Sequence, residues 1–121
     1  MYSIYWEIYG CEMNKSQAYS LKKYLENYDI RETKEINEAN LVIMYTCSVR
    51  KSAEDRALGR LGYFKHIKMS TNPNLKVCLM GCMGEIGEYQ FVQNDLADLV
   101  IGTTNQEQIK DLIDKVVNDE Y

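Results

Sequence analysis

Two nearly continuous apolar runs, LVIMYT (residues 41–46) and LKVCLM (residues 75–80), restrict most strongly what this chain can fold into. Strands that are apolar at successive positions, rather than at alternate ones, are buried on both faces, as in parallel sheets. The first run is followed, over residues 48–68, by apolar residues at helical spacing. This succession of buried strand and helix favours an α/β fold with right-handed crossovers.

The rest of the chain continues the alternation. Further strands are expected at residues 2–9, 30–33 and 98–102. Helices are expected from a start at Asn14, over 48–68, over 84–91, and from a capping box at residues 104–107. The helical residues expected to face the core are Ala18, Leu21, Leu25, Tyr28, Val49, Ala53, Ala57, Leu61, Phe64, Ile109, Leu112, Ile113 and Val116. The sequence therefore predicts one domain over residues 1–121, with an open, mainly parallel, flavodoxin-like sheet and helices on both faces, a three-layer α/β/α arrangement.

The composition fits a folded protein outside the membrane. No segment reaches the roughly 18 consecutive apolar residues that a membrane span needs, and MYSIYWEIYG lacks the basic lead and apolar core of a secretion signal. We therefore expect a cytoplasmic protein without membrane contact. In that reducing compartment its four cysteines should be thiols rather than disulfides.

Charge is distributed unevenly along the chain. The net charge is −4, which argues against nucleic-acid binding by the surface as a whole. Residues 48–68 nevertheless carry six basic against two acidic side chains, a local charge of +4. A solvated helix face is the simpler interpretation. The alternative is a surface that meets RNA phosphates or an acidic partner domain.

Three of the cysteines occupy equivalent places in the predicted fold. Cys11, Cys47 and Cys82 each follow a predicted strand and precede a helical start. Parallel strands end at one edge of the sheet, where ligand sites of open α/β folds lie, so the three sulfurs are expected to converge. Helix N-termini favour the thiolate form of a nearby cysteine. Cys78 lies inside its strand and is expected to be a core residue.

Three converging thiolates indicate a metal site more readily than three inert core residues. Structural zinc usually takes four ligands in closely spaced pairs, but the chain has no C-x-x-C, and its single His66 is expected on a helix away from these loops. An iron–sulfur cluster accepts dispersed cysteine ligands, and three cysteines would leave one iron with an open coordination position.

Three motifs around these cysteines resemble a known family. YGCEMN, TCSVRKSAE and a GC at the end of a third strand occur with 35 and then 34 residues between successive cysteines. In this order they are similar to the N-terminal domain of the radical-SAM methylthiotransferases, and the resemblance covers essentially the entire chain. It departs from the family pattern at Glu12, Tyr45 and Met80, to which we assign no role.

The resemblance implies an auxiliary 4Fe–4S cluster bound by Cys11, Cys47 and Cys82, whose free iron holds the sulfur that is transferred. TCSVRKSAE looks most like the tRNA-modifying branch, which adds a methylthio group to isopentenylated adenosine beside the anticodon. A branch acting on threonylcarbamoyladenosine in tRNA, or on a ribosomal-protein aspartate, is the alternative. Such enzymes also use S-adenosylmethionine and a second 4Fe–4S cluster, and they act on tRNA through further domains.

Those further parts are not expected in this chain. The radical-SAM cluster needs C-x-x-x-C-x-x-C, but Glu85 stands where the third cysteine would follow Cys78 and Cys82. The family's RNA-binding domain is not expected in it either, so the chain alone is not expected to catalyse methylthiolation.

Two other classes of protein fit the sequence less well. A cysteine phosphatase needs C-x5-R, but Gln17, Ala53 and Glu88 occupy the arginine positions. A non-catalytic α/β binding module with buried cysteines remains as the more distant alternative.

Overall fold

The computed structural model describes residues 2–8, 12–46, 51–81, 97–101 and 105–118. Within them lies a sheet of five parallel strands in the order β2-β1-β3-β4-β5. The strands are β1 (Tyr2–Ile8), β2 (Ile30–Glu32), β3 (Leu41–Thr46), β4 (Lys76–Gly81) and β5 (Leu99–Ile101). This is the flavodoxin-like order. The predicted parallel α/β sheet is therefore confirmed.

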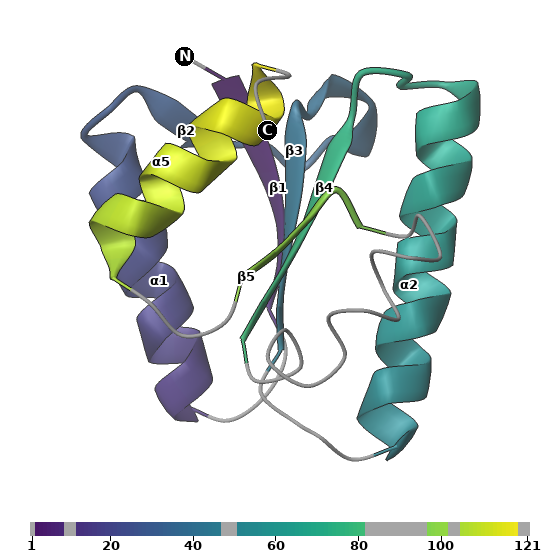
Figure 1. Ribbon diagram of the computed structural model, residues 1–121, viewed down its shortest axis with the longest axis horizontal. Coiled ribbons are helices and arrows are strands. Elements are labelled where there is room, and N and C mark those ends of the chain that lie inside the picture. The colour runs from purple at the N-terminus through teal and green to yellow at the C-terminus, as the bar shows by residue number, and fades with distance from the viewer. Residues whose placement is uncertain (1, 9–11, 47–50, 82–96, 102–104, 119–121) are drawn as a thin grey trace.

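Helices cover both faces of the sheet. They are α1 (Glu12–Glu26), α2 (Lys51–Ser70) and α5 (Gln106–Val117), and a short 3-10 helix, η1 (Ile36–Glu38), precedes β3. Figure 1 shows α1 and α5 together on one side of the sheet and α2 on the other. The predicted three-layer arrangement is thus present. Among the described helices, none is long and apolar enough to cross a bilayer.

Each face of the sheet has its own apolar core. Along β3, Leu41 and Ile43 belong to the core under α1 and α5, whereas Val42 and Met44 belong to the core under α2. All four side chains are 0% exposed. Successive strand residues point to opposite faces, so only a strand covered on both sides can bury four in a row. The apolar run that predicted a central strand is explained by this double burial.

Several local predictions need correction. α1 begins at Glu12, so the expected helix start at Asn14 is wrong, and Asn14 lies inside the helix. Tyr28 lies beyond the end of α1 and is 47% exposed, so its expected place in the core is also wrong. The N-cap of α5 is Asn105, whose side chain accepts a hydrogen bond from the backbone N–H of Gln108 at 2.8 Å. The expected capping box was therefore placed one residue too early.

The other helical predictions have different outcomes. Leu61 and Phe64 are 0% exposed, as predicted. Ile109, Ile113 and Val116 are buried, and Leu112 packs against them while partly exposed. The expected helix at 84–91 and the predicted core residue Val49 lie outside the described residues, as do the side chains of Ala53 and Ala57.

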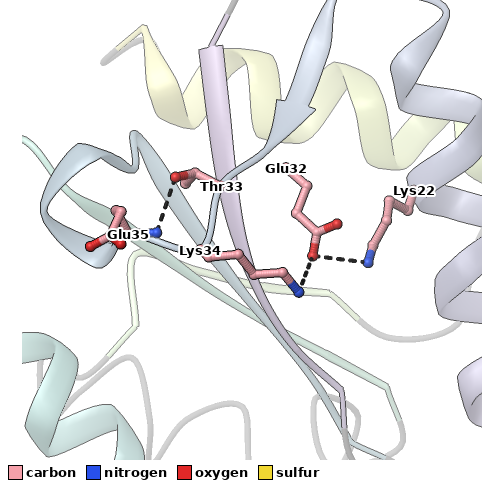
Figure 2. Close-up of polar contacts among 5 residues, drawn as sticks. All are labelled: Lys22, Glu32, Thr33, Lys34 and Glu35. Atoms are coloured by element: carbon pink, nitrogen blue, oxygen red, sulfur yellow. Dashed lines mark hydrogen bonds and ion pairs between the residues drawn. The ribbon is translucent and has the colours of Figure 1, made fainter.

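Charged side chains surround the edge strand β2. Figure 2 shows the carboxylate of Glu32 between two ammonium groups, with Lys22 Nζ at 3.2 Å and Lys34 Nζ at 3.3 Å from the same oxygen. Beyond the strand, the Thr33 hydroxyl accepts a hydrogen bond from the backbone N–H of Glu35 at 3.1 Å. Charges on a short edge strand hinder pairing with the edge of another sheet.

We expect Glu32→Gln to destabilise the chain by less than about 1 kcal/mol at pH 7, and to have a smaller effect at pH 3. Burial raises the pKa of Glu32, but hydrogen bonds and charges from Lys22 and Lys34 outweigh it, so the pKa lies below its usual value. Its stabilising contribution is therefore complete above the unfolded-state pKa of about 4.3 and disappears as the pH falls through the lower folded-state pKa. Urea unfolding of both proteins at the two pH values measures this difference. A difference as large at pH 3 as at pH 7 would contradict the charge-based explanation.

Candidate metal centre

The carboxyl ends of three neighbouring strands define the candidate site. β3 lies between β1 and β4, and all three run in the same direction. Ile8, the last residue of β1, pairs with Tyr45 of β3. Thr46, the last residue of β3, pairs with Gly81, the last residue of β4. The three strands therefore end within one residue of a common row.

The three predicted ligands, Cys11, Cys47 and Cys82, lie outside the described residues. Their places in the chain are nevertheless closely bounded. Cys47 is the next residue after Thr46, and Cys82 is the next residue after Gly81. Cys11 directly precedes the first residue of α1. The structure thus brings together the segments that flank the cysteines, and the ligand set itself stays a prediction.

Cys78 has the role expected of a core residue. It lies within β4, pairs in register with Ile43 and Leu99, and is 0% exposed. Burial raises the pKa of its thiol, and the nearby charge of Asp98 raises it further. A neutral, buried thiol is a poor metal ligand and a poor nucleophile. It also lies three residues before the strand end, about 10 Å at the usual strand rise.

The described side chains offer no competing metal site. Among them, no group of three or more His, Cys, Asp or Glu residues could hold a metal ion. His66 is exposed on α2, as expected for a residue that faces solvent. The three cysteines lie outside the residues to which this finding applies.

One ion pair beside the site was not predicted from the sequence. Arg60 of α2 donates from Nε to the two carboxylate oxygens of Glu7 at 3.0 and 3.1 Å, and from Nη2 to one of them. Its guanidinium lies over the rings of Tyr63 and Phe64, at 4.6 and 5.1 Å from their centroids. The side chain of Glu7 is only 11% exposed. The available signal was an acidic residue in a strand whose neighbours are apolar or aromatic.

A second ion pair lies in the last turn of α2. Lys68 Nζ is 2.8 and 3.0 Å from the carboxylate oxygens of Asp98, which also accepts a hydrogen bond from the backbone N–H of Val77 at 2.8 Å. Arg60 and Lys68 each pair with a carboxylate, although their side chains stay 35% and 30% exposed. Contact of this helix with RNA stays a prediction.

A further contact crosses from β3 to α1. The hydroxyl of Tyr45 donates a hydrogen bond to the side-chain oxygen of Gln17 at 3.2 Å. Tyr45 stands two residues before Cys47, and Gln17 stands six residues after Cys11. The departure from the family pattern at Tyr45 therefore has a structural partner on the helix that follows the first cysteine.

The fold defines an α/β domain with an open parallel sheet, in which three neighbouring strands each precede a cysteine in the sequence. Comparison with known proteins makes the class more specific. The family model described as "Uncharacterized protein family UPF0004" matches residues 3–102, and the chain belongs to this family.

The curated relatives confirm the resemblance to methylthiotransferases. The chain is 35% identical over 112 residues to a tRNA-2-methylthio-N(6)-dimethylallyladenosine synthase from Phocaeicola vulgatus. Proteins of the same name from Desulfotalea psychrophila and Clostridium perfringens are 34% identical over 115 residues and 32% identical over 114 residues. These alignments cover 91%, 93% and 92% of this chain, and 24%, 25% and 25% of the relatives. The chain therefore spans about a quarter of the length of the relatives it matches.

Proposed function

We propose that this chain is the auxiliary 4Fe–4S cluster-binding domain of a tRNA methylthiotransferase, with Cys11, Cys47 and Cys82 as the cluster ligands. The observation that carries the proposal is that β1, β3 and β4 end within one residue of a common row, and each strand precedes one of these cysteines in the sequence. Family membership supports it independently.

The spacing of the strands suits one small inorganic cluster. Adjacent strands lie about 4.8 Å apart, so the outer two of the three strands are separated by about 10 Å. Two residues lie between Ile8 and Cys11 in the sequence. Thiolates are the usual ligands of iron–sulfur clusters. The start of α1 at Glu12 adds the positive end of a helix dipole, which favours the thiolate of Cys11.

In this proposal the chain's own residues bind and orient the cluster, and the full-length enzyme supplies the remaining chemistry. A cluster held by three cysteines offers an iron with an open coordination position, where a sulfur donor can bind. S-adenosylmethionine and a second 4Fe–4S cluster would be held by a radical-SAM domain, because Glu85 breaks the only C-x-x-x-C spacing in this sequence. tRNA would be bound by the full-length enzyme, in the cytoplasm, where thiols stay reduced.

The substrate we propose is a dimethylallyl-type adenosine of tRNA, which receives a methylthio group. The support is the shared name of the relatives described above, all of which are synthases of 2-methylthio-N(6)-dimethylallyladenosine. Threonylcarbamoyladenosine or a ribosomal-protein aspartate has no comparable support among these relatives.

Anaerobic reconstitution of this chain with ferrous iron and sulfide tests the proposal. We expect about four irons and four sulfides per chain, with the broad visible absorption of thiolate-to-iron charge transfer. Chain alkylated at its accessible thiols before reconstitution is the control and should bind none. If the untreated chain takes up no iron and sulfide but binds one zinc ion when zinc is supplied instead, the proposal is contradicted.

A further inference from the structure

We propose that two polar contacts, Glu7–Arg60 and Tyr45–Gln17, position the cysteine loops that follow β1 and β3 relative to one another. We call these two contacts the crossed links. The inference rests on the proposed function, because it concerns how the sequence holds its cluster ligands at the correct separation. It adds four positioning residues, none of which is itself a ligand.

The first link joins the strand before Cys11 to the helix after Cys47. Glu7 is the penultimate residue of β1, and α2 is the helix that follows the second cysteine. The guanidinium of Arg60 forks onto the carboxylate of Glu7 and rests on two aromatic rings. A forked, stacked arginine fixes direction as well as distance, unlike a single flexible ammonium contact.

The second link joins the complementary pair of elements. Tyr45 is the penultimate residue of β3, the strand before Cys47, and Gln17 lies on α1, the helix after Cys11. The unit formed by β1, its loop and α1 is therefore connected to the unit formed by β3, its loop and α2 by two contacts. One tie runs from the first strand to the second helix, and the other runs from the second strand to the first helix.

The two ties act on opposite faces of the sheet. Tyr5 packs in the core under α2, so Glu7, two residues later in the strand, points to the same face. Tyr45 packs against the core under α1 and α5. Glu7 pairs in register with Met44, and Ile8 pairs with Tyr45, so the links lie in adjacent rows at the carboxyl edge. Links on both faces resist rotation of one loop relative to the other, which a single link would permit.

The chain contains a matched control for the first link. Lys68–Asp98 is also a part-buried ion pair of α2, with side-chain exposures of 30% and 24%, against 35% and 11% for Arg60 and Glu7. It joins α2 to the start of β5, next to Val77 near the start of β4, away from the carboxyl edge. A purely structural role predicts similar consequences for the two pairs. A positioning role predicts different ones.

The test compares Arg60→Met with Lys68→Met after anaerobic reconstitution. We expect Arg60→Met to lower the affinity for cluster iron by about tenfold, measured by competition with a chelator, as for other residues that orient metal ligands. Lys68→Met should keep the wild-type affinity. Urea unfolding of both metal-free variants reports their loss of stability separately, and Arg60→Lys should give an intermediate affinity because it keeps the charge without the fork.

A second measurement needs no cluster. In a Cys82→Ala parent, dibromobimane, which becomes fluorescent on bridging two nearby thiols, reports the proximity of Cys11 and Cys47, because Cys78 is buried. Arg60→Met and Tyr45→Phe should slow the bridging several-fold, whereas Lys68→Met should not. Tyr45→Phe removes only a hydroxyl from an exposed contact and keeps the inference testable if Arg60→Met fails to fold.

The outcomes separate this inference from the proposed function. If the wild-type chain takes up no cluster, the proposed function fails, while slower bridging in the link variants still supports the positioning role. If the wild type is loaded but both link variants bridge and bind iron as the wild type does, the crossed links are overturned and the proposed function stands. Absence of bridging in the Cys82→Ala parent itself, or equal losses in Lys68→Met, would also overturn them.

Discussion

Replacing Cys11, Cys47 or Cys82 by alanine is expected to abolish assembly of the iron–sulfur cluster, from about four irons per chain to none. Each replacement removes one of the three proposed thiolate ligands, and two cysteines cannot hold a cluster that already has one iron without a protein ligand. Iron and sulfide analysis after anaerobic reconstitution, together with the visible absorption, measures the loss.

Cys78→Ala is the control for this series. Its thiol is buried within β4, so we expect full iron content and a loss of about 1 kcal/mol in stability from the small cavity. Equal loss of iron on changing Cys78 would show that the ligand assignment is wrong. Retention of iron in any one of the other three variants would remove that cysteine from the proposed set.

Phe64→Ala is expected to have the largest effect on stability, about 3–5 kcal/mol. The ring is 0% exposed, packs edge-on against Tyr5 with centroids 6.2 Å apart, and carries the guanidinium of Arg60. Its removal leaves a cavity between α2 and the sheet. Since small domains are stable by only about 5–15 kcal/mol, urea unfolding of the metal-free chain should show a large shift in midpoint.

Tyr63→Ala provides the comparison on the same helix. Its ring is 41% exposed, although it also contacts Arg60 and Phe64. We expect a loss below about 1 kcal/mol. Similar losses of stability for the two variants would contradict the difference in burial between the two rings.

The sheet was predictable because its strongest signals are local. The run at 41–46 is apolar at consecutive positions, and such a pattern has few solutions other than a strand covered on both faces. Helix ends were less predictable. Thr104 and Asn105 are both good N-cap residues, and only the backbone conformation decides which one accepts the hydrogen bond from Gln108. Asn14 likewise suits a cap, yet α1 begins two residues before it.

The candidate site was predictable only as far as strand direction determines it. Cysteines placed after predicted strands are expected at one edge once the sheet is parallel, and the order of β1, β3 and β4 confirms that their strands are neighbours. The Glu7–Arg60 pair could not be predicted in the same way. Its partners lie 53 residues apart, on a strand and a helix, and their meeting depends on how α2 is rotated on the sheet.

The parallel arrangement of β1, β3 and β4 also has a consequence for the order of events in maturation. In a zinc finger the ligands are close in sequence, and the metal drives a short peptide to fold. Here the proposed donors are separated by 35 and 34 residues, and the strands that precede them are neighbours only in the folded sheet. If the proposed function holds, the cluster is acquired after tertiary folding, and a misfolded chain stays without one.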